Sequence, residues 1–190
     1  MTEQSTRDTV PAVHWLRRGT PADIDALHAL ACEPAVYRYL ADNRPPDRAV
    51  VEPWLDVPLE DRAAGLGTWL LLGPSGVLDG AVLLQRDAAP RTAELVYLLH
   101  PRAWGHGLAT RMSWTVMARA FAVGRVDVVI AGADVPNVAS IAVMRRLGMT
   151  FLRDVAYPLG AGVQYRRARD DPPPMPVPDE LVVQADDAAR

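Results

Sequence analysis

The sequence predicts an α/β domain in which a mixed sheet carries helices on both faces. Three observations lead to this fold class. Apolar segments with strand periodicity alternate along the chain with segments of helical periodicity. Residues 126–131 are almost entirely apolar, as expected for a strand in the middle of a sheet. The length of 190 residues and mass of 20.7 kDa suit a single domain.

The first half of the chain alternates between short strands and short helices. The strand that begins at His14 ends at Gly19, and Thr20 caps the next helix, with Pro21 at its first position. The segment Gly73-Pro74-Ser75-Gly76 is a hairpin signal between two apolar runs. The expected elements are strand 14–18, helix 20–31, helix 34–40, helix 48–55 interrupted by a proline, and strands 68–72 and 77–85.

The second half contains one long amphipathic helix. Leu108, Met112, Val116 and Ala120 recur at i, i+4 spacing, and Gly124 ends this helix. The expected elements are strand 93–100, helix 107–123, strand 126–131, helix 136–147 closed by a glycine, and strands 149–153 and 163–167.

The two ends of the chain differ in composition from this body. Residues 170–190 hold six acidic residues, one arginine and five prolines, and residues 1–12 are polar. Neither segment offers enough apolar surface to offset the entropy of ordering it. We therefore expect a flexible N-terminus over 1–12, a folded domain over 13–169 and a Pro-rich acidic disordered tail over 170–190.

Charge and cysteine content exclude several classes of protein. The net charge is −3, and every one of the 20 basic residues is arginine, so a phosphate-loop lysine is absent. Residues 13–169 are only slightly basic, which argues against a protein that binds nucleic acids. Cys32 is the single cysteine, which excludes an intrachain disulfide and a cysteine-based zinc site. The first residues lack a signal-peptide core, and no apolar run is long enough to span a bilayer. We expect a cytoplasmic protein without a metal site or a membrane partner.

The segment LVYLLHPRAWGHGLATRM combines a strand, a glycine turn and a helix start. Glycine lets the backbone approach a ligand closely, and the free N–H groups of a first helical turn favour an anion such as a diphosphate. A dinucleotide fold would also need a third glycine where Thr110 stands and a shorter turn, although Asp134 mimics its acidic residue. A purely structural glycine turn is a further alternative.

Within this segment, the run Arg102 to Gly107 resembles the (Arg/Gln)-x-x-Gly-x-(Gly/Ala) acetyl-CoA signature of the GNAT N-acetyltransferases. The segments AELVYLLHP and AGADVPNVASIAVMRRLGMTF, and LRRGTPADIDALHALACEPAVYRYL followed by Trp54-Leu55, resemble the branch that acetylates N-terminal alanine or serine of ribosomal proteins. The resemblance covers roughly residues 13–169.

This resemblance implies a mostly antiparallel sheet of six to seven strands, in which two central parallel strands splay apart to admit the thioester. It implies acetyl-CoA as cosubstrate and no metal. Backbone amides of the signature would hold the diphosphate, and the edge of the preceding strand and an asparagine would bind the pantetheine arm. The residues expected at the acetyl-CoA site are Leu98, Leu99, His100, Arg102, Trp104, Gly105, His106, Gly107, Leu108, Ala109, Thr110 and Asn137.

The implied reaction is direct transfer, in which a neutral amine attacks the thioester carbonyl and a backbone N–H stabilises the oxyanion. Glu94 is the expected general base, and His100 is a weaker candidate. Many members have a tyrosine on the late helix that protonates the thiolate, but here that position is Met144, and Ser140 lies one turn earlier.

The expected acceptor is a primary amine, possibly a protein N-terminal amine. A small-amine or antibiotic acetyltransferase and a non-catalytic acyl-CoA-binding sensor are the alternatives, and the protein is expected to be a monomer or a homodimer.

Overall fold

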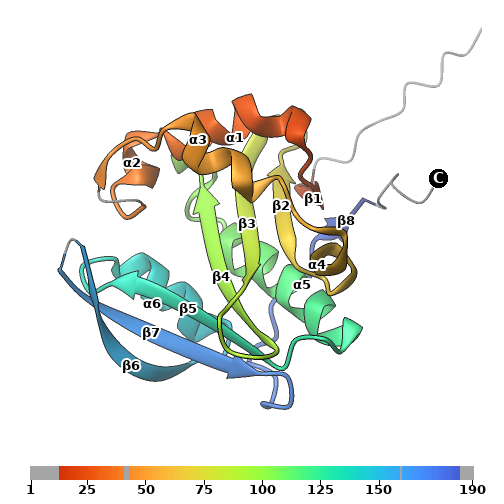
Figure 1. The fold of residues 1–190 in the computed structure, drawn as a ribbon, viewed down its shortest axis with the longest axis vertical. Helices are drawn as coiled ribbons and strands as arrows, with labels where there is room; N and C mark the ends of the chain where they lie inside the picture. Colours follow the sequence, from red (N-terminus) through yellow and green to blue (C-terminus); the bar gives the residue numbers. More distant parts are fainter. Residues whose placement is uncertain (1–12, 41–42, 159, 185–190) are drawn as a thin grey trace, which may run out of the picture.

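The computed structural model describes residues 13–40, 43–158 and 160–184 (Figure 1). The expected flexible N-terminus, 1–12, and the last six residues of the expected tail lie outside the described residues. Among the described residues, no helix is both long enough and apolar enough to cross a membrane.

The described residues form one eight-stranded mixed sheet with the order β6-β7-β5-β4-β3-β2-β1-β8. Its strands are β1 (Trp15–Arg18), β2 (Gly67–Leu72), β3 (Leu78–Arg86), β4 (Thr92–Leu99), β5 (Val128–Asp134), β6 (Thr150–Tyr157), β7 (Gly160–Ala168) and β8 (Val182–Val183). Neighbouring strands are antiparallel except in the pairs β4–β5 and β1–β8. The fold class is confirmed, but the expected strand number was too low because β8 comes from the segment expected to be disordered.

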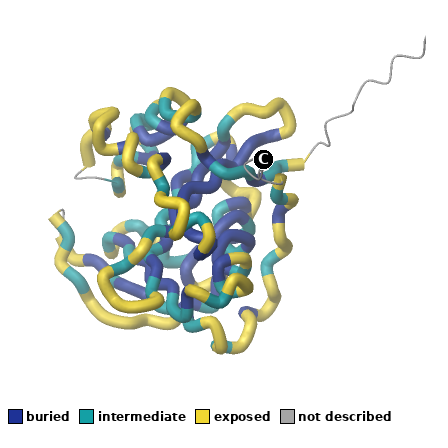
Figure 2. Tube along the Cα trace, turned by 45° about the vertical axis from the view of Figure 1, so that its right-hand side comes forward, coloured by how far each residue is buried: buried dark blue, intermediate teal, exposed yellow. Residues whose placement is uncertain are grey.

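Helices cover both faces of the sheet. The helices are α1 (Ile24–Ala31), α2 (Pro34–Tyr37), α3 (Arg48–Val51), α4 (Leu59–Ala63), α5 (Leu108–Val123) and α6 (Val138–Arg146), with the short 3-10 turns η1 (Pro21–Asp23), η3 (Glu52–Trp54) and η4 (Pro101–Ala103). Because side chains alternate along β3, Val82 and Leu84 join the core under α5 and α6, whereas Ala81 and Leu83 join the core under α1 and α3. Buried residues therefore follow the central strands and the inner sides of these helices (Figure 2).

Two elements differ from the sequence expectation for a physical reason. The helix α4 was not expected, because it is short and its first residue, Leu59, is 84% exposed instead of forming an apolar stripe. The strand β6 is longer than expected, since its residues from Thr150 to Asp154 are all exposed and show no apolar alternation. Its pairing with β7 defines it instead.

The parallel strands β4 and β5 separate after a short paired stretch. They pair only from Thr92 with Val128 to Glu94 with Ile130. Beyond that point β4 stays paired with β3, and β5 stays paired with β7. The two strands therefore leave facing edges that no other strand of the described residues occupies, as the splayed arrangement expected from the resemblance requires (Figure 1).

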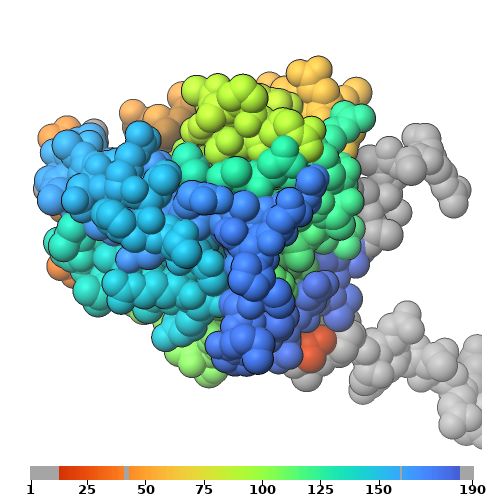
Figure 3. Space-filling model, turned by 90° about the horizontal axis from the view of Figure 1, so that it is seen from below, coloured from red at the N-terminus to blue at the C-terminus, as the bar shows by residue number. Residues whose placement is uncertain are grey.

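Residues 170–184, which we call the strap, are packed on the body and correct the expectation of a disordered tail over this range. The buried guanidinium of Arg167 donates hydrogen bonds to the carbonyls of Asp171 and Pro172, at 3.1 and 2.9 Å. Leu181 is buried, and its N–H donates to the Thr115 hydroxyl at 2.9 Å. Figure 3 shows the strap in dark blue, lying across the surface beside α5.

The strap ends as a strand because the edge of β1 is free to receive it. Val182 and Val183 pair in parallel with Trp15 and Leu16, and the N–H of Gln184 donates to the Leu16 carbonyl at 2.8 Å. The short run Leu-Val-Val is apolar and its two valines are β-branched, which suits this pairing. The average composition of the last 21 residues hides this short docking segment.

Candidate functional site

A groove of about 1800 Å³ opens where β4 and β5 separate. Its walls are β4 from Glu94 onward, the end of β5, the first turn of α5, one side of α6 and part of the strap. Residues within 35–40 and residues 157–158 also line it, so the groove brings together segments that lie far apart in the sequence. A volume of this size can accommodate an extended ligand with a second molecule beside it.

The first turn of α5 forms one end of this groove. Gly105 and Gly107 have φ angles of 80° and 69°, a region that glycine adopts without strain. A Cβ atom on either glycine would meet nothing within 4 Å, so the space beside this backbone is open. The first turn of α5 contains no acidic side chain. As at the start of any α-helix, its first N–H groups have no carbonyl acceptor within the helix. This end of the groove is suited to an anion such as a diphosphate.

Glu94 lies at the point where the two parallel strands part. It is the last residue of β4 that pairs with β5, and it is partly buried in the wall of the groove. Burial raises the pKa of Glu94, and the negative charge of Asp87 raises it further. A carboxyl group with a raised pKa is a better proton acceptor near neutral pH than an exposed glutamate.

Asp134 is a second carboxylate in the groove. It ends β5, and its Oδ1 atom is buried without a hydrogen-bond partner among the described residues. It also lines an adjoining hollow of about 500 Å³ with Arg38, Tyr39 and Asn43. From the sequence, Asp134 was expected only as the acid of a dinucleotide fold. Its place directly after an apolar strand was the available signal for a site residue.

The Tyr157 hydroxyl lies against the backbone of Gly132, where a Cβ atom would collide with it. Burial raises the pKa of Tyr157, and the charges of Glu94 and Asp134 raise it further. Both carboxylates therefore act on this phenol, which lines the same groove. The two acidic residues and Tyr157 share one end of the groove.

Tyr97, Ser140 and Asn137 form a hydrogen-bonded chain across the groove. The hydroxyl oxygens of Tyr97 and Ser140 are 2.7 Å apart, and the Tyr97 hydroxyl donates to the Ser140 carbonyl at 3.0 Å. Asn137 caps α6, because its Oδ1 accepts the N–H of Ser140 at 3.2 Å. Burial raises the pKa of Tyr97 to about 12, so its hydroxyl stays protonated across the ordinary pH range. Met144 is fully buried in the core and does not line the groove.

The groove contains eleven of the fourteen residues singled out from the sequence. These are Glu94, Leu98, Leu99, Trp104, Gly105, Gly107, Leu108, Ala109, Thr110, Asn137 and Ser140. The structure places the other three outside its walls. His100 Nδ1 accepts the N–H of Arg102 at 3.2 Å, and Arg102 Nε donates to Asp79 at 2.6 Å, so both residues stabilise the turn after β4. His106 is exposed on the same turn.

Three arginines at the groove were not anticipated from the sequence. Arg111 lies in the first turn of α5, and Arg145 and Arg146 lie in the last turn of α6. In the part of the chain that the structure describes, none of these three guanidinium groups forms an ion pair with a carboxylate. Arginine is frequent throughout this sequence, so composition alone did not distinguish them.

Comparison with known proteins identifies similar sequences and folds. Residues 15–150 match the family model described as acetyltransferase (GNAT) domain. The structure of YncA from Salmonella typhimurium with its cofactor acetyl-CoA is similar, with 21% identity, a TM-score of 0.69 and coverage of 88% of this chain and 98% of that one. Aminoglycoside acetyltransferase AAC(6')-Ib with coenzyme A is 16% identical, with a TM-score of 0.66 and coverage of 83% and 95%.

RimL, a ribosomal L7/L12 alpha-N-protein acetyltransferase in complex with coenzyme A, is also similar. It is 18% identical, with a TM-score of 0.68 and coverage of 84% of this chain and 97% of that one. The ribosomal-protein branch is therefore one among several neighbours with the same fold, and these levels of identity do not single it out.

Proposed function

The chain belongs to the GNAT acetyltransferase family, and we propose that it transfers an acetyl group from acetyl-CoA to a primary amine. One observation carries this proposal. The groove between the separated strands β4 and β5 contains Glu94, a carboxyl with a raised pKa, and also reaches the open N-terminus of α5. A proton acceptor and an anion site in one groove are the two features that this transfer needs.

The residues of the groove fit acetyl-CoA, which supplies the acetyl group as a thioester. The N–H groups of the first turn of α5 would hold the diphosphate, because Gly105 and Gly107 leave the space beside them open. The edge of β4 near Leu98 and Leu99 would align the pantetheine arm. The Asn137 side-chain nitrogen can donate to this arm, since the oxygen of the same amide already caps α6.

Glu94 would remove a proton from the acceptor. A primary amine is an ammonium ion near pH 7, and it becomes a nucleophile only after losing a proton. The raised pKa of Glu94 makes it a suitable acceptor for that proton, directly or through one water molecule. The ammonium ion first loses one proton through Glu94 to solvent, and the neutral amine then forms the C–N bond as the C–S bond breaks. The nitrogen loses its second proton to solvent as the amide forms, and the thiolate takes one proton from solvent, so the net products are the amide, the CoA thiol and one proton.

Ser140 would stabilise the leaving sulfur in place of the tyrosine that many family members carry. The Tyr97 hydroxyl has two acceptors on Ser140, the carbonyl oxygen and Oγ, and when it donates to Oγ the Ser140 hydroxyl proton is available to a sulfur atom in the groove. Tyr97 holds its own proton because its pKa is raised to about 12. Tyr97 is thus a positioning residue that acts through Ser140.

The two carboxylates favour an acceptor that carries positive charge. The unpartnered buried oxygen of Asp134 would receive an N–H donor from the incoming ammonium group or from a second cationic group on the same molecule. A protein N-terminus and a small cationic amine both meet this requirement. The single cysteine supports a location in a reducing compartment such as the cytoplasm.

The proposal is tested by measuring release of free CoA thiol from acetyl-CoA with a panel of N-terminal peptides and a panel of small polyamines and aminoglycosides. Turnover with one panel is the expected result and identifies the acceptor class. Binding of acetyl-CoA without turnover on either panel would instead indicate a non-catalytic sensor. Failure to bind acetyl-CoA would refute the proposal.

The base is tested with Glu94→Gln, which keeps size but loses basicity. The rate at saturating acetyl-CoA should fall about 10²- to 10⁴-fold, the usual share of general-base catalysis. The acidic limb of the pH–rate profile, which should lie above the ordinary glutamate pKa because burial raises that of Glu94, should flatten. Acetyl-CoA affinity should not change.

The matched control for Glu94→Gln is Asp134→Asn, a carboxamide in the same groove. It should raise KM for the amine and keep the acidic limb. The reverse pattern, with the limb lost only in Asp134→Asn, would assign the base to Asp134.

A further inference from the structure

We propose that residues 174–179 of the strap form a wall of the acetyl-CoA site at its nucleotide end. The adenosine 3′,5′-bisphosphate half of the molecule would then lie between the strap and the arginines of α5 and α6. This inference rests on the proposed function and adds to it a binding subsite from a segment beyond the matched family region, which ends at residue 150.

The strap lines the same groove as the anion-binding turn. Residues 174–179 and the first turn of α5 both contribute to its walls, and Arg111 joins them directly. The Arg111 backbone N–H donates to the Gly107 carbonyl at 3.1 Å, and its side-chain Nε donates to the Asp179 carbonyl at 3.4 Å. A diphosphate at the start of α5 therefore has the strap as its neighbour.

Charge at this end of the groove suits a ligand with several phosphates. Arg111, Arg145 and Arg146 line it, and within the described residues none of them is paired with a carboxylate. Arg145 Nε donates to the neutral Tyr165 hydroxyl at 3.3 Å. Guanidinium groups that are not paired with a carboxylate are common ligands of phosphate in proteins. Among the described residues that line the groove, the strap contributes one carboxylate, Asp179, which is exposed.

The wall is rigid, and it is uncharged from residue 174 to residue 178. Between the acidic pairs at 170–171 and 179–180 the sequence reads PPPMPVP, so Asp179 at the end of the wall is its one acidic residue. Met175 and Val177 are 89% and 48% exposed, which leaves apolar side chains available for contact with an adenine ring. The prolines restrict the backbone, so ligand binding orders little additional chain.

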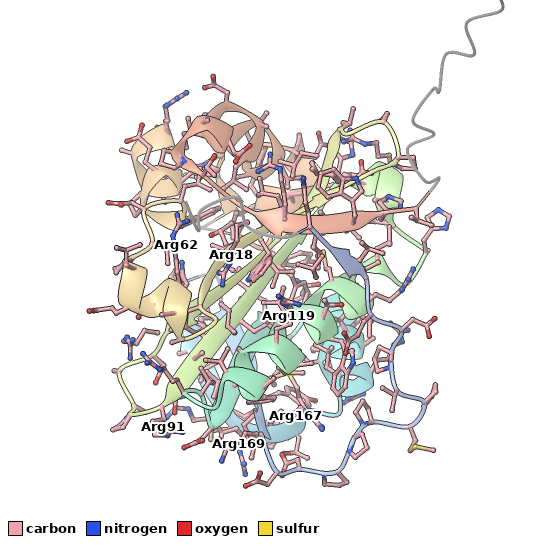
Figure 4. The ribbon with its side chains drawn as sticks, turned by 90° about the vertical axis from the view of Figure 1, so that its right-hand side faces the viewer. Arg18, Arg62, Arg91, Arg119, Arg167 and Arg169 are labelled. Atoms are coloured by element: carbon pink, nitrogen blue, oxygen red, sulfur yellow. The ribbon has the colours of Figure 1, made fainter. Side chains whose placement is uncertain are left out.

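Both ends of the wall are fixed to the body. Arg167 lies where the chain enters the strap and donates to the carbonyls of Asp171, Pro172 and Gly148 (Figure 4). The buried Pro174 packs against Gly148, and Leu181 with β8 anchors the other end. A segment held at both ends beside an open groove is a preformed surface, which lowers the entropy cost of binding.

The test is a matched pair of substitutions in the 190-residue chain, Val177→Asp in the wall and Val77→Asp in the turn before β3. Both valines are exposed, but only Val177 lines the groove. A carboxylate at position 177 should repel the phosphates of CoA, so calorimetry should show at least a tenfold weaker Kd for CoA. Val77→Asp should bind CoA within about twofold of the wild type. Adenosine 3′,5′-bisphosphate, used alone as the probe, should lose affinity in Val177→Asp by a similar factor.

The outcomes distinguish failure of the proposed function from failure of the nucleotide subsite. Wild-type protein that fails to bind CoA refutes the proposed function and the subsite together. Wild-type binding with equal affinities in the two variants refutes the subsite alone. Melting curves check that both variants fold, and Met175→Asp, at the most exposed apolar residue of the wall, replaces Val177→Asp if that variant is unfolded.

Discussion

Replacing Leu181 with alanine should destabilise the protein although this residue lies in an acidic, proline-rich segment. Leu181 is 6% exposed and belongs to the core under α5. Removing a buried leucine side chain costs about 2–5 kcal/mol. The site is near the surface and can partly collapse, so we expect the lower end, about 2–3 kcal/mol. For a chain of this length each kcal/mol shifts the Tm by about 2–4 °C, which predicts a fall of about 4–12 °C.

The matched control is Met175→Ala, an apolar residue of the same strap that is 89% exposed. This change should alter the free energy of unfolding by less than about 0.5 kcal/mol, as for other surface substitutions. Urea denaturation followed by circular dichroism measures both variants. If Leu181→Ala were as mild as Met175→Ala, the strap would be solvated, and the composition-based expectation of a disordered tail would be correct for residues 170–184.

Two further variants test the groove. Gly107→Val places a branched side chain beside the anion-binding turn at a φ of 69°, and it should weaken acetyl-CoA binding at least tenfold, about 1.4 kcal/mol, by calorimetry. Gly76→Val, at a φ of 77° with open space around it, carries the same backbone strain and should leave this affinity unchanged; equal losses would assign the effect to strain. Tyr97→Phe removes the hydroxyl that holds Ser140, and kcat should fall about tenfold, the value of one hydrogen bond. Because burial raises the pKa of Tyr97 to about 12, that factor should be the same at every pH from about 6 to 10; a factor that changes with pH would give Tyr97 a titrating role.

The fold class and the glycine turn before α5 could be predicted from the sequence because both depend on local patterns. The alternation of strand and helix periods indicates an α/β sheet whatever the strand order. The glycines at 105 and 107 are needed where they stand, since the backbone there has positive φ and approaches open space. Glu94 was also identified, but through its resemblance to a family pattern. Its burial and raised pKa became visible only in the tertiary structure.

Composition predicted the strap wrongly because docking depends on a few residues and on the surface that receives them. The average charge of residues 170–190 indicates disorder, yet Leu181 and two valines match a free strand edge and the Thr115 hydroxyl of α5. No property of the tail itself shows that β1 has an unoccupied edge.

The sequence by itself determined the local elements of this protein, namely the apolar strands, the long helix with glycines at both ends and the turn that exposes its N–H groups. Only the tertiary structure decided which side chains meet. Tyr97 and Ser140 are 43 residues apart in the sequence. Asp179 of the strap contacts Arg111 in the first turn of α5, which lies more than 60 residues earlier. Such contacts depend on the strand order and on the point where β4 and β5 separate. The periodicity of the sequence assigns a side chain only to one face of its helix or strand, whereas the packing of distant segments decides which other side chains it contacts.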